Sequence, residues 1–213
     1  MPLQHTVQQG EHLSSIAERY GFADYRVLWD HSDNAELKQL RQSPHVLLPD
    51  DVVAVPDRAE KSAPAETGKL HVFQVDAEPL RIRLRAQDYF GEPIASTECV
   101  LTVEGTEYEL VTDGDGYVEQ EIPAKAERAT LKIGELELDL RIGHLDPVDT
   151  TTGLVARLNN LGYYNGDLPE EDADLDQEQL AFAIELFQWD NDFTVDGQKT
   201  DDLLGKIRDT FGC

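Results

Sequence analysis

The spacing of apolar residues changes twice along this chain of 213 residues, and this change limits the possible folds more than any other feature. Near the start, Leu13, Ile16 and Ala17 recur at the spacing of one helix face. Between residues 80 and 142 the apolar residues alternate with polar ones, as in half-buried strands. Helical spacing returns in the last third of the chain. We therefore predict an α+β protein built from several modules.

The first module is predicted to span residues 1–58. A strand at residues 5–7 leads into a helix that Gly21 ends, and Asp24 is a favourable cap for a second short helix. A valine-rich strand at residues 52–55 completes a βααβ order. Residues 59–69 have the small, polar composition of a linker, with one proline and one glycine.

The second module is predicted to be a small antiparallel β-sandwich over residues 70–145. Ile82 and Leu84 alternate with arginines, and residues 136–142 alternate leucine or isoleucine with charged residues. Gly134 with Glu135 fits a tight hairpin between two such strands, because glycine tolerates the backbone of the first turn position.

The third module, residues 146–213, is predicted to be a three-helix bundle. Thr151 or Thr152 is a candidate cap of the first helix, Asp176 of the second and Thr200 of the third. Each candidate precedes apolar residues spaced along one helix face, so three amphipathic helices can enclose one core.

The first module resembles the LysM family. The resemblance rests on HTVQQGEHLSSIA at residues 5–17 and LPDDVVAVP at residues 48–56. It implies a shallow groove for glycans that contain N-acetylglucosamine, between the first strand-to-helix turn and the loop before the last strand. Transferred by position, the candidate glycan-binding residues are Gly10, Glu11, His12, Leu13, Leu47, Leu48, Pro49 and Asp50.

Two features of this module depart from the family pattern. Glu11 and His12 stand where the family usually has Asp followed by Thr or Ser, so the hydroxyl cap of the first helix is missing. The connection over residues 31–45 is also long, and residues 35–40 have the composition of an extra helical turn beside the groove. Glu11 and His12 are therefore either ligand contacts or solvated turn residues.

The third module is similar to the peptidoglycan-binding domain, type 1. The similarity rests on LVARLNNLGY at residues 154–163, AIELFQ at residues 183–188 and VDGQKTDDLL at residues 195–204. It implies a cleft for peptidoglycan stems near the end of the first helix, with Gly162, Tyr163 and Tyr164 as candidates; Tyr163 can equally be a core residue. The middle module loosely resembles carboxypeptidase-regulatory-like and bacterial immunoglobulin-like modules, through DYFGEPI at residues 88–94 and TDGDG at residues 112–116.

The net charge of −25 bears on the partners of the chain. Such a charge repels phosphate backbones and anionic headgroups, so we expect no nucleic-acid partner and no membrane partner. Residues 146–213 carry 16 acidic and 4 basic residues, so the acidity is greatest in the third module.

The sequence contains no pattern that predicts catalysis. The six histidines lack the spacing of a zinc site, and Cys99 and Cys213 lack the context of a nucleophile or a disulfide framework. We expect no enzyme activity, no metal and no cofactor. The first residues lack the basic and apolar segments of a secretory signal, so we expect synthesis in the cytoplasm, with export to the periplasm or a target cell through a specialised secretion system.

These resemblances lead to two functional hypotheses. The first is a non-catalytic peptidoglycan-binding protein that is delivered by, or accessory to, a bacterial contractile injection system such as type VI secretion; residues 81–94 and 142–149 resemble leaderless proteins of that kind. The second is an adaptor that docks a protein of the injection apparatus or a toxic effector and does not bind wall. The strong negative charge suits a basic protein partner for such an adaptor.

Overall fold

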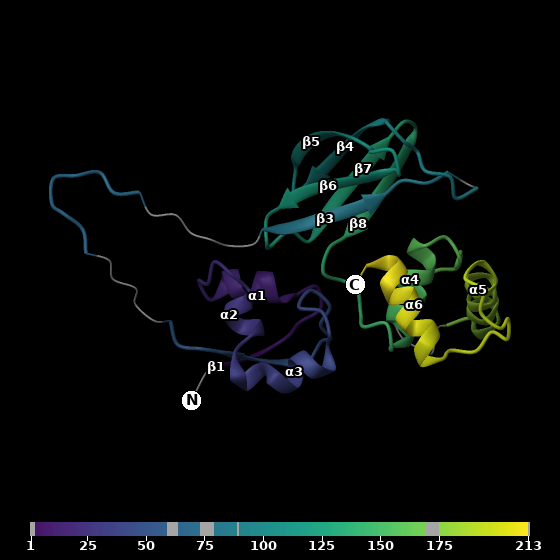
Figure 1. Cartoon of the computed structure of the whole chain (residues 1–213), viewed down its shortest axis with the longest axis horizontal. Coiled ribbons are helices and arrows are strands. Elements are labelled where there is room, and N and C mark those ends of the chain that lie inside the picture. The colour runs from purple at the N-terminus through teal and green to yellow at the C-terminus, as the bar shows by residue number, and fades with distance from the viewer. Residues whose placement is uncertain (1–2, 59–63, 73–78, 89, 169–174, 213) are drawn as a thin grey trace. The chain divides into compact units, whose positions relative to one another are not determined.

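The computed structural model describes residues 3–58, 64–72, 79–88, 90–168 and 175–212 (Figure 1). Its described part contains six α-helices and several antiparallel sheets, so the predicted mixture of helices and strands is confirmed. The chain divides into two compact units: residues 1–45 with 49–144, and residues 46–48 with 145–213. Residues 59–63 of the predicted linker and Cys213 lie outside the described residues.

The N-terminal part is closed by one antiparallel strand pair. Strand β1, Leu3–Thr6, pairs with β2, Val52–Val55, with Leu3 opposite Val55. The elements between the two strands are α1, Leu13–Arg19; α2, Arg26–Trp29; a 3-10 turn, Ser32–Asn34; and α3, Ala35–Leu40. The predicted order of strand, two helices and strand is therefore present, and the long connection contributes α3 as a third helix.

Helix α1 begins without a hydroxyl-bearing residue at its N-cap, as the sequence predicted. His12 is its extended N-cap residue, and the Ser15 hydroxyl accepts a hydrogen bond from the His12 amide at 3.1 Å. Ser15 thus satisfies the amide of the N-cap residue itself, as the N3 residue of a capping box does; a hydroxyl cap would serve an amide of the first turn instead. The helix ends before Gly21, whose φ of +77° belongs to the left-handed region that glycine adopts without a steric penalty.

The β-rich part contains two antiparallel sheets. Strands β3, Leu80–Arg85, and β6, Tyr117–Ile122, form the smaller sheet. The larger sheet has the order β5-β4-β7-β8, with bounds Thr106–Val111, Glu98–Val103, Arg128–Ile133 and Leu136–Arg141. Buried Leu101 and Leu131 of the larger sheet share a core with half-buried Ile82 and Leu84 of the smaller one, so both sheets are anchored by the same apolar cluster.

The predicted hairpin at Gly134 is confirmed, but the burial predicted for the strand after it is partly wrong. Ile133 pairs with Leu136 across the turn, and Gly134 has a φ of +57°. Leu136 and Leu138 are nevertheless 46% and 41% exposed. The reason is that β8 is the last strand of its sheet, so the inner face of an edge strand is only half covered.

Three helices form the C-terminal part: α4, Thr151–Asn160; α5, Gln177–Asp190; and α6, Asp201–Phe211. They share a core in which Leu154, Phe187 and Leu203 are fully buried. The caps predicted at Asp176 and Thr200 are confirmed by their hydrogen bonds to helix amides. The cap of α4 is Thr150 and not Thr151 or Thr152, because only Thr150 has an extended backbone and accepts from the Gly153 amide, at 3.0 Å.

The described helices include none with the length and apolar composition needed to cross a membrane.

Candidate functional site

The turn after β1 lies against the loop that precedes β2. The Val7 amide donates to the Asp51 carbonyl at 2.8 Å, and the Asp50 amide donates back to the Val7 carbonyl at 3.0 Å. On the other side of the turn, the Leu13 amide donates to the Pro44 carbonyl at 3.0 Å. These three bonds fix the predicted glycan-binding turn beside the ends of the loop over residues 44–51.

A buried ion pair holds this loop at its C-terminal end. Arg41, at the end of α3, donates from Nε and Nη2 to the two carboxylate oxygens of Asp51 at 2.7 and 2.8 Å. Both side chains are about nine-tenths buried. Sequence reasoning missed this pair, because a single arginine and aspartate ten residues apart in a polar stretch have no pattern.

Asn34 is a second anchor that the sequence did not reveal. Its side chain is 1% exposed and donates to the carbonyls of Leu28 and Ala54, both at 2.8 Å. Its Oδ1 accepts from the Ala54 amide at 2.7 Å. One amide group therefore joins the end of α2 to strand β2. It satisfies the buried amide and carbonyl of Ala54, whereas the Leu28 carbonyl also accepts from the His31 amide at 3.1 Å.

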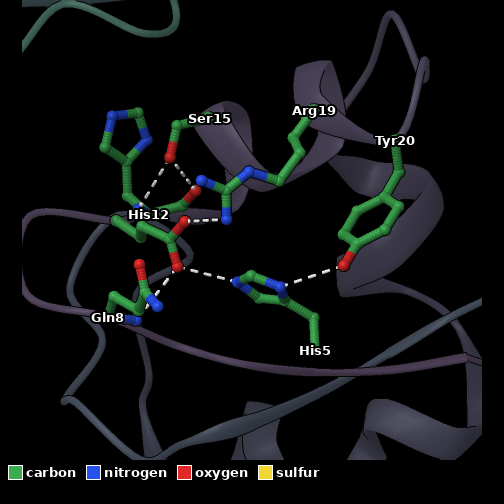
Figure 2. A network of polar contacts seen from close by, with 7 residues as sticks. His5, Gln8, His12, Ser15, Arg19 and Tyr20 are labelled. Carbon is green, nitrogen blue, oxygen red and sulfur yellow. Dashed lines mark hydrogen bonds and ion pairs between the residues drawn. The ribbon is translucent and has the colours of Figure 1, made fainter.

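Glu11 is not a free acid, because it belongs to a polar network with His5, Gln8 and Arg19, which Figure 2 labels. Its Oε2 accepts from the Gln8 amide at 2.9 Å and lies 2.7 Å from His5 Nε2, while Oε1 pairs with Arg19. His5 Nδ1 lies 3.1 Å from the Tyr20 hydroxyl, which continues the network. Burial raises the pKa of Glu11, but these hydrogen bonds and the nearby positive charges outweigh it, so the net shift is downward.

His12 lies next to Glu11 in sequence but is neutral and buried. Its side chain is 2% exposed, and its ring packs edge-on against His45 with centroids 6.0 Å apart. Burial, followed by the charge of His45, lowers the pKa of His12 to about 4, against a smaller opposing effect of Glu11. Its Nδ1 has no hydrogen-bond partner among the described residues. The histidine is therefore a packing residue at neutral pH.

The predicted glycan-binding residues differ in accessibility. Leu13 and Leu47 are buried at 0% and 5% exposure, so their side chains support the backbone from inside. Gly10 and Leu48 are half-buried, while Pro49 and Asp50 are exposed. The side chains of Pro49 and Asp50, with the backbone at Gly10, are therefore the parts of the predicted site most open to a ligand.

The C-terminal candidates also differ from one another. Gly162 is exposed and has a φ of +86°. Tyr164 is 4% exposed and belongs to the helical core, so its ring is not a ligand platform. Tyr163 is half-buried: its ring meets Phe187 edge-on at 5.2 Å and its hydroxyl donates to Asp190 Oδ2 at 3.2 Å. Of the two tyrosines, Tyr163 alone presents an accessible edge.

Gln188 organises the turn before α6, and the sequence did not mark it. This 3% exposed side chain accepts from the amides of Asp196 and Gly197, both at 2.9 Å. It also donates to Asp196 Oδ1 at 2.8 Å. A glutamine inside AIELFQ has the appearance of a surface residue, and only the packing of α5 turns it inward.

No cluster of three or more metal-ligating side chains occurs in the described ranges. Burial raises the pKa of the Cys99 thiol, which keeps it protonated and a poor nucleophile. In comparisons with protein-family models, curated proteins and solved structures, no match to this chain was found.

Proposed function

We propose that this chain is a non-catalytic peptidoglycan-binding protein, with a LysM-like module at residues 1–58 and a peptidoglycan-binding three-helix module at residues 146–213, joined by a β-sandwich. In this proposal it is delivered by, or accessory to, a contractile injection system. The observation that carries the proposal is the pair of hydrogen bonds between Val7 and residues 50–51. These bonds hold the turn after β1 beside the exposed residues Pro49 and Asp50, which supports a shared binding surface at this place.

Two weak sites on one chain suit a repetitive polymer. Once one module holds the wall, the second binds from a high effective concentration, so the full chain binds more tightly than either site alone. The proposal does not need a charged contact: the chain and the stem-peptide carboxylates of the wall are both negative. Added salt screens that repulsion, so it should leave binding intact or strengthen it.

Co-sedimentation of the full chain with purified sacculi tests the proposal. We expect the chain to sediment at low and at high salt, and we expect Pro49→Glu to weaken this by roughly tenfold because it adds a charge to the exposed edge of the loop. Pro123→Glu, which makes the same change at an exposed proline in the β-rich part, is the matched control. Absence of sedimentation at both salt concentrations, or equal losses in both variants, would contradict the proposal.

A further inference from the structure

The outward face of α5 carries an apolar stripe that the described residues of its module leave exposed. Phe182, Leu186 and Trp189 are 61%, 39% and 75% exposed. Their spacing of four and three residues puts them on one side of the helix. The opposite side, which includes Ile184 and Phe187, is buried in the helical core. Two aromatic rings and a leucine on one exposed stripe are more than scattered surface residues, and such a patch marks an interaction site.

Carboxylates flank this stripe. Helical spacing places Glu178 and Glu185 along one side of the stripe and Asp190 along the other side. Residues 146–213 carry 16 acidic and 4 basic residues, so the surrounding field is negative as well. An apolar centre with a charged rim is the arrangement of a protein interface, in which the rim selects the charge of the partner.

We propose that the outer face of α5 docks a basic amphipathic segment of another protein, with apolar side chains on the stripe and lysines or arginines on the rim. A second copy of this chain is a poorer occupant, because it would bring Glu178, Glu185 and Asp190 against the same acids. Nucleic acid and anionic lipid are repelled by the same field. Docking on this face goes beyond wall binding and needs neither Pro49 nor the turn after β1.

A peptide whose leucines and lysines fall on opposite faces of a helix is the first probe. Its fluorescence anisotropy with the full chain should give saturable binding that weakens as salt rises. A scrambled peptide of the same composition and a leucine–glutamate peptide of the helical pattern should bind at least roughly tenfold more weakly. Equal binding of the scrambled peptide would mean that charge alone attracts the probe, and the proposal would fail.

Two sets of variants locate the site. Phe182→Ser with Trp189→Ser should cost roughly tenfold or more in affinity, whereas Val27→Ser with Leu40→Ser, which removes exposed apolar side chains elsewhere, should cost nothing. Glu178→Gln with Glu185→Gln keeps the stripe, and it should weaken binding and reduce its salt dependence.

If the stripe variant self-associates less than the parent chain in sedimentation velocity, the occupant is a second copy. If it loses sacculus binding and keeps peptide binding, the face belongs to the wall; either result overturns the proposal.

Discussion

The N-terminal and C-terminal parts each contain a buried amide side chain that bonds to backbone groups, Asn34 in the first and Gln188 in the second. The two side chains differ in the solvent exposure of the groups that they bond to. Asn34 bonds to backbone groups at the end of α2 and in strand β2, all of them buried. Gln188 bonds to a turn in which Asp196 is exposed and Gly197 half-buried. Water can replace lost partners at the turn and cannot do so at the strand. The same chemical group should therefore matter more in the N-terminal part.

The two parts also bury different nitrogen-containing side chains. His12 is neutral in the fold and can gain a proton, whereas Arg157, 1% exposed, donates to the carbonyls of Asp146 and Gly153 at 2.7 and 2.9 Å. A guanidinium does not lose its proton in the accessible pH range. Mild acid should therefore weaken the N-terminal part and leave the buried cation of the C-terminal part unchanged.

The largest expected effect comes from Asn34→Ala. The substitution leaves the buried amide and carbonyl of Ala54 without their Asn34 partner, while the Leu28 carbonyl keeps its bond from the His31 amide; the free energy of unfolding of the N-terminal part should fall by about 4 kcal/mol. Urea unfolding followed by Trp29 fluorescence in a Trp189→Phe background measures it. Asn160→Ala, at an exposed position in α4, is the control and should change little. A decrease in the free energy of unfolding of less than about 1 kcal/mol would contradict the larger role that we assign to Asn34 than to Gln188.

The next effect is the pH dependence that His12 introduces. Its pKa falls from 6.5 in the unfolded chain to about 4 in the fold, so the unfolded chain binds the extra proton first as pH decreases. Stability should decrease by about 3 kcal/mol between pH 6.5 and pH 4. In His12→Asn this slope should disappear, while His71→Asn, at an exposed histidine, should keep it. The measurement is the midpoint of urea unfolding at each pH in that range, followed by Trp29 fluorescence in the same Trp189→Phe background.

A smaller effect is expected from Gln188→Ala. Loss of its bonds to Asp196 and Gly197 should cost about 2 kcal/mol, because water reaches the released turn. Amide hydrogen exchange should accelerate at Asp196 and Gly197. Gln179→Ala in the same helix is the matched control, since it changes the same residue type at an exposed position. A cost as large as that of Asn34→Ala would contradict the comparison.

The smallest effect is expected from Glu11→Gln. The pKa of Glu11 is lowered in the fold, so its charge stabilises the protein above about pH 4.5 and this contribution is lost as pH falls through the folded pKa. Because Arg19 is half exposed, the loss at neutral pH should be about 1 kcal/mol. Thermal unfolding of Glu11→Gln beside Glu18→Gln measures it; a difference that persists at pH 3 would assign the effect to packing.

Local pattern predicted several helices and strands, but not all of their bounds. The first strand, predicted at residues 5–7, is Leu3–Thr6, and the N-cap of α2 is Tyr25 and not Asp24. The end of α1, the start of α6 and the hairpin at Gly134 were predictable, because a turn glycine or a threonine cap determines the backbone around it. The cap of α4 was missed by one residue, since three threonines in a row are equivalent until one adopts an extended backbone. The exposure of Leu138 was missed because an edge strand has the same alternation as a central one.

The sequence alone therefore determined the mixture of helices and strands, which depends on neighbours a few residues away, and the strongly acidic charge, which depends on composition alone. Tertiary structure decided which polar groups are anchors and which are accessible. Glu11 is paired with Arg19 and His5, Gln188 is turned inward and Trp189 is left outside only once the elements have packed. Burial and pairing join residues that are distant along the chain, and for that reason they have no local pattern.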